Sequence, residues 1–227
     1  MTESTAYFSR RRWLELMLAT GGALATGSLS QILAQEPNRP ETPNMVLGPF
    51  YPQVKQADRD TDLTIIRGHH TPASGQVVHL RGRVLDHRGE PVRNARVELW
   101  QTNSHGRYAH QSDPNTAAPL DPNFQGFGAQ LTDREGRFRF KTVKPGPYPS
   151  REGTWMRAPH FHFDVQGRVD RKVTQLYFPN EPLNDQDRLL QTVRGDRTAL
   201  LGTVEAAGSL GSPGDLLVRW DIILASG

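Results

Sequence analysis

The body of the chain alternates short apolar runs with turn residues, a pattern that is typical of β-strands. The only helical pattern in the body is short and lies around residues 185–193. Because strands bounded by turns pack as layers, we predict a mostly β protein: a single antiparallel β-sandwich with long loops and few short helices. The expected strands are residues 77–85, 95–102, 126–131, 137–143, 160–165, 172–178 and 216–224.

One predicted hairpin shows the alternation clearly. It joins residues 126–131 to residues 137–143, and Phe138 and Phe140 fall on one face because side chains alternate along a strand. Residues 103–125, in contrast, have no regular periodicity. Loops of this length in a compact domain usually build a site, so we expect functional residues there.

The first 34 residues have the pattern of an export signal. Three consecutive arginines, Arg10 to Arg12, precede an apolar stretch over residues 16–33, and the small residue Ala34 follows. This arrangement predicts a signal peptide at residues 1–34, and the paired arginines favour the twin-arginine route. The alternatives are an ordinary secretory signal or an anchor helix, although glycines in the apolar stretch disfavour a stable membrane span. We expect a periplasmic or extracellular protein with no stable membrane association after processing.

The remaining length suits one domain. Residues 35–44 are polar and contain three prolines, which predicts an extended linker, and residues 45–227 are long enough for a single domain with a sizeable core. The 21 glycines and 17 prolines of the chain suit a β protein with many turns.

Charge and cysteine content exclude several functions. The formal net charge is only +3, and no dense Lys/Arg run follows the N-terminal region, so neither nucleic acid nor a membrane surface is indicated as a partner. A weakly basic body still favours an anionic substrate. The chain contains no cysteine, which excludes disulfides and thiolate metal sites.

The sharpest local motif is a pair of histidines in a predicted strand. His160 and His162 point to the same face, whereas Phe161 and Phe163 point to the other face and toward the core. Two imidazoles on one face are a ready platform for a metal ion. Two surface histidines on a half-buried strand would give the same pattern.

Two tyrosines stand in unusual loop contexts. Tyr108 lies within the long aperiodic segment, and Tyr148 is flanked by Pro147 and Pro149. Prolines on both sides fix the backbone and aim the phenol. Each tyrosine taken alone could equally pack its ring and leave its hydroxyl in water.

Together these stretches resemble a known family, the intradiol ring-cleavage dioxygenases, and in particular the β-subunit type of protocatechuate 3,4-dioxygenase. The motif Gly-Pro-Phe-Tyr at residues 48–51 also resembles the entry motif of these enzymes. The likeness covers most of residues 45–225. The matching pieces are residues 100–101, 106–108, 118–124, 131–133, 144–149, 157–163 and 175–178.

The resemblance implies a ferric site with four protein ligands. These are Tyr108, Tyr148, His160 and His162. The chemistry agrees, because phenolate is a hard anionic donor that suits Fe³⁺ and two neutral imidazoles complete a mixed oxygen and nitrogen set.

The resemblance also implies the reaction. A catechol-type small molecule and O₂ would react to give a cis,cis-muconate that keeps both oxygen atoms. Tyr148 would take a catechol proton, Arg157 would stabilise carbanion character in the ring, and Gln175 would hydrogen-bond nearby. Tyr51 of the entry motif is expected to bind substrate. Outside this context, Arg157 and Gln175 would be taken for a surface arginine and a strand glutamine.

One residue near the expected substrate pocket departs from the family pattern. Ser150 stands where the β-subunit family often carries tryptophan, which predicts a more open pocket wall.

Because the chain combines an entry motif with a complete ligand set, we expect a homo-oligomer, with a hetero-oligomer as the alternative. Export suggests an extracytoplasmic substrate, such as a lignin-derived or otherwise substituted catechol.

Two other functions fit parts of the sequence. His160, His162 and Asp164 share a strand face, so a site for Fe²⁺ with two histidines and a carboxylate is conceivable. Residues 77–101 and 131–143 have the pattern of a prealbumin-like sandwich, which would favour a binding module without catalysis.

Overall fold

The computed structural model describes residues 39–55 and 58–227. The predicted signal peptide at residues 1–34 and the first part of the predicted linker lie outside the described residues. None of the helices in the described ranges is long and apolar enough to cross a membrane.

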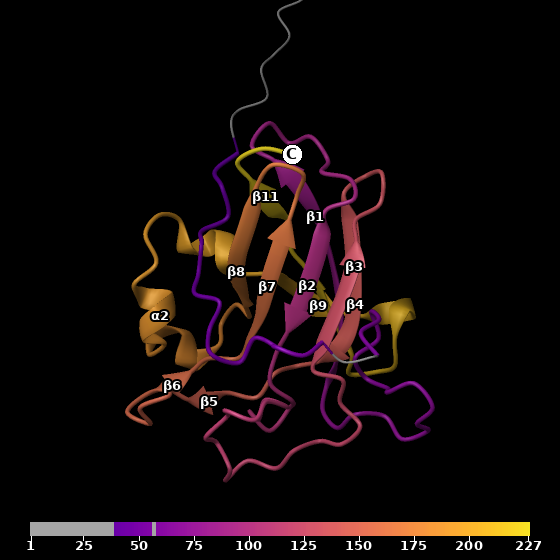
Figure 1. Cartoon of the computed structure of the whole chain (residues 1–227), viewed down its shortest axis with the longest axis vertical. Coiled ribbons are helices and arrows are strands. Elements are labelled where there is room, and N and C mark those ends of the chain that lie inside the picture. Colours follow the sequence, from indigo (N-terminus) through magenta and orange to yellow (C-terminus); the bar gives the residue numbers. More distant parts are fainter. Residues whose placement is uncertain (1–38, 56–57) are drawn as a thin grey trace, which may run out of the picture. The chain divides into compact units, whose positions relative to one another are not determined.

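The first sheet has five strands and is built around β1 (Val77–Asp86) (Figure 1). On one side β1 pairs antiparallel with β4 (Arg137–Val143). On its other side β1 pairs first with β10 (Leu216–Arg219) and then with β11 (Ile222–Leu224), and both of these pairings are parallel. The sheet ends at β9 (Thr203–Ala206), which lies antiparallel to β10.

The second sheet has four strands, and all its pairings are antiparallel. Its order is β3 (Phe127–Leu131), β2 (Arg96–Trp100), β7 (His160–Gln166) and β8 (Arg171–Tyr177). The mostly β fold is therefore confirmed. The sandwich differs from the prediction in one respect, because the last strands run parallel to β1.

The predicted strand at residues 216–224 is divided into β10 and β11. At the break, the carbonyl oxygen of Trp220 lies so close to Gly82 that a Cβ there would be 1.8 Å from it. The Trp220 N–H donates to the Arg81 carbonyl at 3.0 Å, and the Asp221 carboxylate accepts from the Arg83 N–H at 3.0 Å. These bonds replace regular pairing for two residues, which a pattern of apolar residues cannot reveal.

The remaining elements are short. The helix predicted around residues 185–193 is only the four-residue α2 (Arg188–Gln191), and Asp187 caps its N-terminus by accepting from two backbone N–H groups. The other elements are the paired strands β5 (Tyr148–Pro149) and β6 (Met156–Arg157), and the 3-10 helices η1 (Pro182–Asp185), η2 (Arg197–Leu200) and η3 (Gly208–Leu210).

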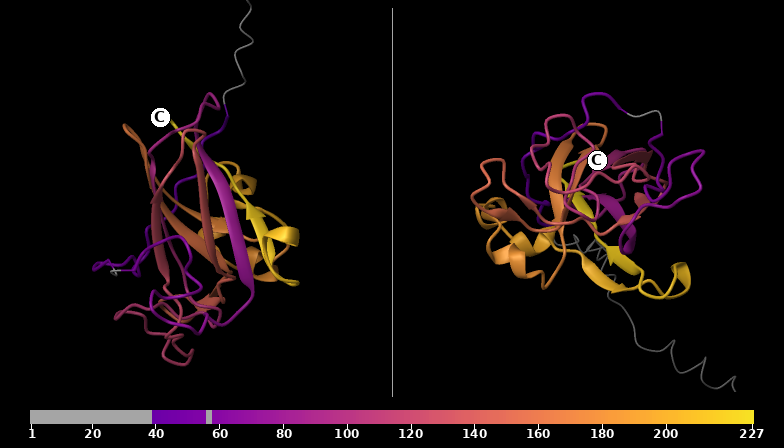
Figure 2. Two further views of the ribbon diagram at one scale, coloured as in Figure 1. Left: turned by 90° about the vertical axis from the view of Figure 1, so that its right-hand side faces the viewer. Right: turned by 90° about the horizontal axis from the view of Figure 1, so that it is seen from below.

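The core lies between the two sheets, which form separate layers when the sandwich is seen from the side (Figure 2, left). Phe138 and Phe140 of β4 share one face, as predicted, and this face points into the core, where both rings belong to the same cluster as Phe161 and Phe163 of β7. Burying each of these rings stabilises the fold by about 2–3 kcal/mol. The intervening residues of β7 point to the outer face of the four-stranded sheet.

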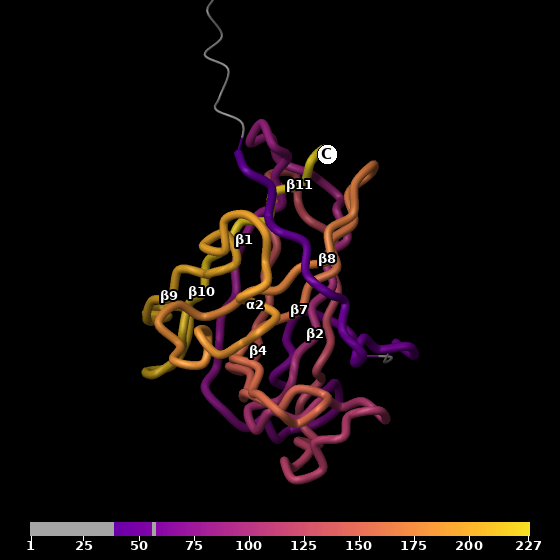
Figure 3. Tube along the Cα trace, turned by 90° about the vertical axis from the view of Figure 1, so that its left-hand side faces the viewer, coloured from indigo at the N-terminus to yellow at the C-terminus, as the bar shows by residue number. Residues whose placement is uncertain are grey.

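The described part of the predicted linker is extended and bonded to the sandwich. It runs beside β8 (Figure 3). The Thr42 N–H donates to the Ile223 carbonyl at 3.1 Å, and the Met45 N–H donates to the Val173 carbonyl at 2.8 Å. This segment therefore fixes where the chain enters the region of residues 46–55.

The long loops gather at one end of the sandwich, at the foot of Figure 1. At this end β2 finishes, β7 begins, and the β5–β6 pair lies beside them. Residues 103–125, predicted as a site-building loop, belong to this group. Side chains from different strands and loops therefore meet at this end of the sandwich.

Replacing Gly82 by alanine tests the break between β10 and β11. The new methyl group would collide with the Trp220 backbone, so we expect the free energy of unfolding to fall by about 3 kcal/mol in chemical denaturation. Gly167→Ala is the matched control, because its Cβ would meet the flexible end of Leu224 at 3.1 Å and no other atom closer than 3.5 Å. Equal losses in both variants would contradict this explanation.

Candidate active site

Four buried side chains, one from a loop and three from the strands β5 and β7, converge at the loop end of the sandwich. Tyr108 Oη lies 3.2 Å from Tyr148 Oη, which lies 3.3 Å from His160 Nε2. His160 Nε2 in turn lies 3.1 Å from His162 Nε2. All four side chains are at most 7% exposed. The structure thus brings together all four residues that were predicted as metal ligands.

The two histidines are fixed by their strand and by aromatic neighbours. They occupy alternate positions of β7, so both point to the outer face of the four-stranded sheet. Trp100 of β2 stacks on His162 with ring centroids 4.9 Å apart, and Tyr177 of β8 stacks on His160 at 5.1 Å. Each imidazole therefore has a single orientation.

The two tyrosines are placed by the close approach of their loops. Gly106 has φ of +80°, and a Cβ there would lie 2.1 Å from the Pro147 carbonyl oxygen, so only glycine lets the loops meet. The Asp113 carboxylate accepts from the Tyr108 N–H at 2.7 Å, and Tyr148 pairs with Arg157 in the β5–β6 ladder. Backbone contacts thus aim both phenols at the histidines.

Burial keeps the two imidazoles neutral. It lowers the pKa of His160 and of His162 well below the usual value, and the positive charge of Arg157 lowers both further. His160 Nδ1 donates to the Ala158 carbonyl at 2.6 Å, which leaves the lone pair of Nε2 directed at the cluster. His162 Nδ1 is buried without a partner among the described residues.

Burial also acts on the two phenols. It raises the pKa of Tyr108 well above the usual value, and the neighbouring Tyr148 raises it further. Burial raises the pKa of Tyr148 as well, although the positive charge of Arg157 opposes this shift. The raised pKa favours the protonated form of both phenols, even with Arg157 beside Tyr148, and a metal ion bound to their oxygen atoms would be needed to ionise them.

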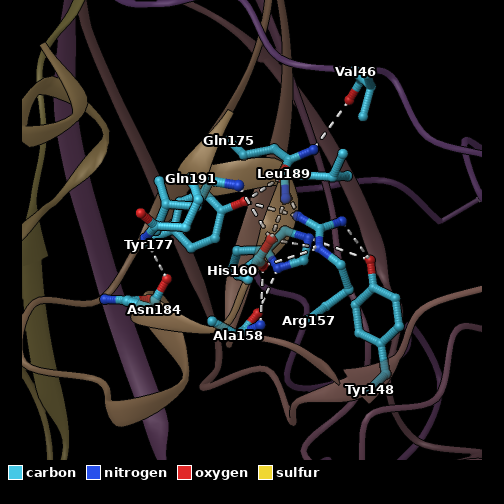
Figure 4. Close-up of polar contacts among 12 residues, drawn as sticks. Val46, Tyr148, Arg157, Ala158, His160, Gln175, Tyr177, Asn184, Leu189 and Gln191 are labelled. Carbon is cyan, nitrogen blue, oxygen red and sulfur yellow. Dashed lines mark hydrogen bonds and ion pairs between the residues drawn. The ribbon is translucent and has the colours of Figure 1, made fainter. Parts of the chain in front are cut away.

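Arg157 is a buried cation whose guanidinium group is bonded on every side (Figure 4). Its Nε donates to Asp187 at 2.9 Å, one terminal nitrogen donates to Tyr148 Oη at 3.3 Å, and the other donates to Gln175 Oε1 at 2.7 Å and to Tyr177 Oη at 2.8 Å. Burial alone would lower the pKa of Arg157, but the two tyrosines and Asp187 outweigh it and raise the pKa. The guanidinium therefore stays charged beside Tyr148.

Tyr177 and Asp187 are site residues that were not predicted from the sequence. Tyr177 Oη donates to Gln175 Oε1 at 2.7 Å, and Asp187 neutralises Arg157 and also accepts from the Ala158 N–H at 3.1 Å. In the sequence, Asp187 falls within the helical pattern around residues 185–193, and that pattern gives no indication of an arginine partner.

Tyr51 does not join the four-residue cluster. Its hydroxyl donates to Glu98 Oε2 at 2.7 Å, and its ring packs edge-on against Trp100 with centroids 5.0 Å apart. Its neighbour Phe50 contacts the cluster instead, with its ring centroid 4.7 Å from that of Tyr108. Of the two aromatic residues in the entry motif, Phe50 is therefore the one beside the cluster.

Asp164 is engaged elsewhere, which weakens the alternative of a site with two histidines and a carboxylate. Both of its oxygens accept from Arg171, at 2.9 and 2.8 Å. In residues 39–55 and 58–227, no three His, Cys, Asp or Glu side chains are grouped as a metal would require. A metal bound at this cluster would therefore need the tyrosines among its ligands.

A mostly β sandwich with two buried phenols and two imidazoles defines the class of enzyme. Residues 46–226 match the sequence model of a family that is described as Dioxygenase. The chain belongs to this family and is an intradiol ring-cleavage dioxygenase, an oxidoreductase that acts on catechols.

Individual relatives agree with this assignment. The beta chain of protocatechuate 3,4-dioxygenase from Burkholderia cepacia is 42% identical over 181 residues, which are 75% of this chain and 76% of the relative. The dioxygenase domain of a dioxygenase carbohydrate-binding protein fusion from Streptomyces sp. SirexAA-E superposes with a TM-score of 0.60 and 25% identity, over 83% of this chain and 100% of that one. The 3-chlorocatechol 1,2-dioxygenase of Rhodococcus opacus 1CP superposes with a TM-score of 0.65 and 22% identity, over 87% and 77%, and shows the shared fold alone.

Removing the Asp187 carboxylate tests its role as the partner of Arg157. In Asp187→Ala the guanidinium would remain buried without its counter-charge, so we expect the free energy of unfolding to fall by about 3–5 kcal/mol. Asp196→Ala is the control, because Asp196 also caps a short helix, η2, but pairs with no arginine among the described residues. Similar losses in both variants would show that capping, and not charge compensation, is the main role of Asp187.

Proposed function

We propose that this dioxygenase holds Fe³⁺ with Tyr108, Tyr148, His160 and His162 and opens a catechol ring with O₂ to a cis,cis-muconate. The observation that carries the proposal is the convergence of two phenol oxygens and two imidazole nitrogens, each 3.1–3.3 Å from the next. Metal ligands at about 2 Å from one ion lie about 3 Å apart, so these separations fit a shared metal.

The character of the donors also fits Fe³⁺. The imidazoles are neutral, with the Nε2 lone pair of His160 free to bind a metal. The phenols would ionise next to a trivalent cation, and phenolate is a hard donor that favours the ferric state. A bound ferric ion would supply the positive centre at which a catechol chelates and becomes susceptible to O₂.

Tyr148 and Arg157 are the residues that we propose to act on the substrate. Tyr148 Oη, ionised to a phenolate by the metal, would accept a proton from a catechol hydroxyl, and Arg157 donates a hydrogen bond to this same oxygen. The guanidinium, held by Asp187 and Gln175, would then stabilise negative charge that develops in the ring. Because the guanidinium is already oriented, this stabilisation requires no reorganisation.

The substrate is proposed to be a catechol-type small molecule, protocatechuate-like or otherwise substituted. The name of the Burkholderia relative specifies protocatechuate, and that of the Rhodococcus structure specifies 3-chlorocatechol. Ser150 is a small residue next to the proline that follows Tyr148, and a small side chain there would make the pocket wall more open to a ring substituent. Rates with a panel of catechols test this proposal, and activity confined to unsubstituted catechol would contradict it.

The assembly is proposed to be a homo-oligomer. The chain itself supplies both the motif at residues 48–51 and the complete donor set, so a second kind of subunit is not required to complete the set. Light scattering on the purified chain tests this, because a monomer, or activity only after addition of a different subunit, would contradict it.

The location is proposed to be periplasmic or extracellular, after twin-arginine export and cleavage near Ala34. Support comes from the arginines at residues 10–12 and the apolar stretch that follows them. Replacing all three arginines by lysine should leave an unprocessed precursor in the cytoplasm. Normal processing of that variant would contradict the twin-arginine route.

Loss of a donor tests the metal site. His160→Ala should retain only a small fraction of the wild-type iron after purification, because it removes one of the four proposed ligands. The lone pair of His160 Nε2 is also fixed in direction by the bond from Nδ1 to Ala158. His105→Ala, at an exposed loop position, is the control and should bind iron normally. Metal analysis by mass spectrometry gives the answer, and full iron content in His160→Ala would contradict the assignment.

A conservative change at Arg157 tests its proposed role. Lysine keeps the charge but cannot bond Asp187, Tyr148 and Gln175 together, so we expect kcat to fall roughly 100-fold in Arg157→Lys. The control is Arg188→Lys, because Arg188 packs over the Trp155 ring as Arg157 does but lies outside the site. An unchanged kcat in Arg157→Lys with full iron content would contradict the role.

A further inference from the structure

Residues 46–55, which we call the strap, cross the outer face of the four-stranded sheet above the donor cluster. Gly48 has φ of +79°, and a Cβ there would lie 3.2 Å from His162 Cε1. Phe50 lies against Tyr108, with ring centroids 4.7 Å apart. The strap therefore covers two of the four donors, His162 and Tyr108, which are 2% and 3% exposed.

The start of the strap is bonded to β8. The Met45 N–H donates to the Val173 carbonyl at 2.8 Å, and Gln175 Nε2 donates to the Val46 carbonyl at 3.1 Å. Beyond Val46, no backbone–backbone hydrogen bond within the described chain joins the strap to the sheet. Its later part must therefore be held by side chains.

Those side-chain contacts meet at one buried carboxylate, that of Glu98 on β2. Glu98 is 3% exposed, and its Oε2 accepts from Tyr51 Oη at 2.7 Å and from Lys55 Nζ at 2.6 Å. Its Oε1 accepts from Arg96 at 2.7 Å. Lys55 Nζ also lies 4.4 Å from the Tyr51 ring centroid, so the ammonium, the phenol and the carboxylate form one closed group.

We propose that Glu98 is a positioning residue for the dioxygenase reaction, which acts through Tyr51 and Lys55 to hold the strap over His162 and Tyr108. The charge of the carboxylate is essential, because all three of its partners are donors and two carry positive charge. A glutamine at this position would direct its amide N–H groups at one of these donors, and the hydrogen bond to that donor would be lost. Tyr51 accordingly serves as an anchor of the strap, and Phe50 is its contact with the cluster.

Asp164 provides a matched control for Glu98. It lies directly opposite Glu98 across the β2–β7 pairing, is 1% exposed and likewise binds an arginine, Arg171. Within the described part of the chain, the Asp164 carboxylate bonds to Arg171 and not to the strap. Glu98→Gln and Asp164→Asn therefore remove the same charge at the same depth of the same face, but only the first releases the strap.

The experiment uses the iron-loaded chain and measures proteolysis and kinetics in both variants. Chymotrypsin can cut after Phe50, whereas Pro52 protects the bond after Tyr51. We expect Glu98→Gln to be cut after Phe50 roughly tenfold faster than wild type, because the strap opens locally. We also expect the KM for catechol to rise roughly tenfold with a smaller change in kcat. Asp164→Asn should match wild type in both measurements.

Wild-type cleavage and KM in Glu98→Gln would overturn the proposal, and so would equal effects in Asp164→Asn. If Glu98→Gln does not fold, Lys55→Met is the second variant, because it removes only the partly exposed ammonium. Lys55→Met should show the same two changes. Wild-type cleavage and KM in Lys55→Met would equally overturn the proposal. The kinetic part rests on the proposed function, but the cleavage part does not. If Glu98→Gln is cut faster but the chain has no dioxygenase activity, the proposed function is contradicted, whereas the role of Glu98 in holding the strap is supported.

Discussion

The alternation of side chains along β7 is the constraint on which the site depends. Phe161 and Phe163 point into the core between the sheets, so His160 and His162 must point to the opposite face. Slipping the pairing of this strand by one residue would bury the imidazoles in the core and expose the phenyl rings. The hydrophobic core therefore sets the direction of the donor nitrogens, and packing of Trp100 and Tyr177 against them sets their angle.

Around this strand the fold solves an electrostatic problem. Four titratable groups are buried together, and burial favours the neutral form of each of them. Among the described residues, Arg157 is the charged side chain that bonds to a donor atom of the cluster, and it is stabilised by Asp187 and by neutral acceptors. Without a metal, the site is thus a set of neutral donors next to a fixed positive charge. That charge favours the phenolate form of Tyr148, which is the form that would bind a metal ion.

The sequence allowed the face of each β7 residue and the mostly β fold to be predicted, because both follow from a period of two that is local to the strand. The four donors could be predicted through their motifs, and the structure brings them together. Asp187 and Glu98 could not be predicted as partners of Arg157 and Lys55, because these pairs are 30 and 43 residues apart and depend on how the loops fold. The break between β10 and β11 depends in the same way on a backbone approach to Gly82.

The most direct test of the account is the visible spectrum of the purified, iron-loaded chain before and after a catechol is added without oxygen. The account predicts a charge-transfer band from phenolates on Fe³⁺, a shift of that band when the catechol chelates, and ring opening when O₂ is admitted. A chain that binds iron but shows no such band, or whose band does not respond to a catechol, would contradict the claim that two tyrosines and two histidines form the reaction centre.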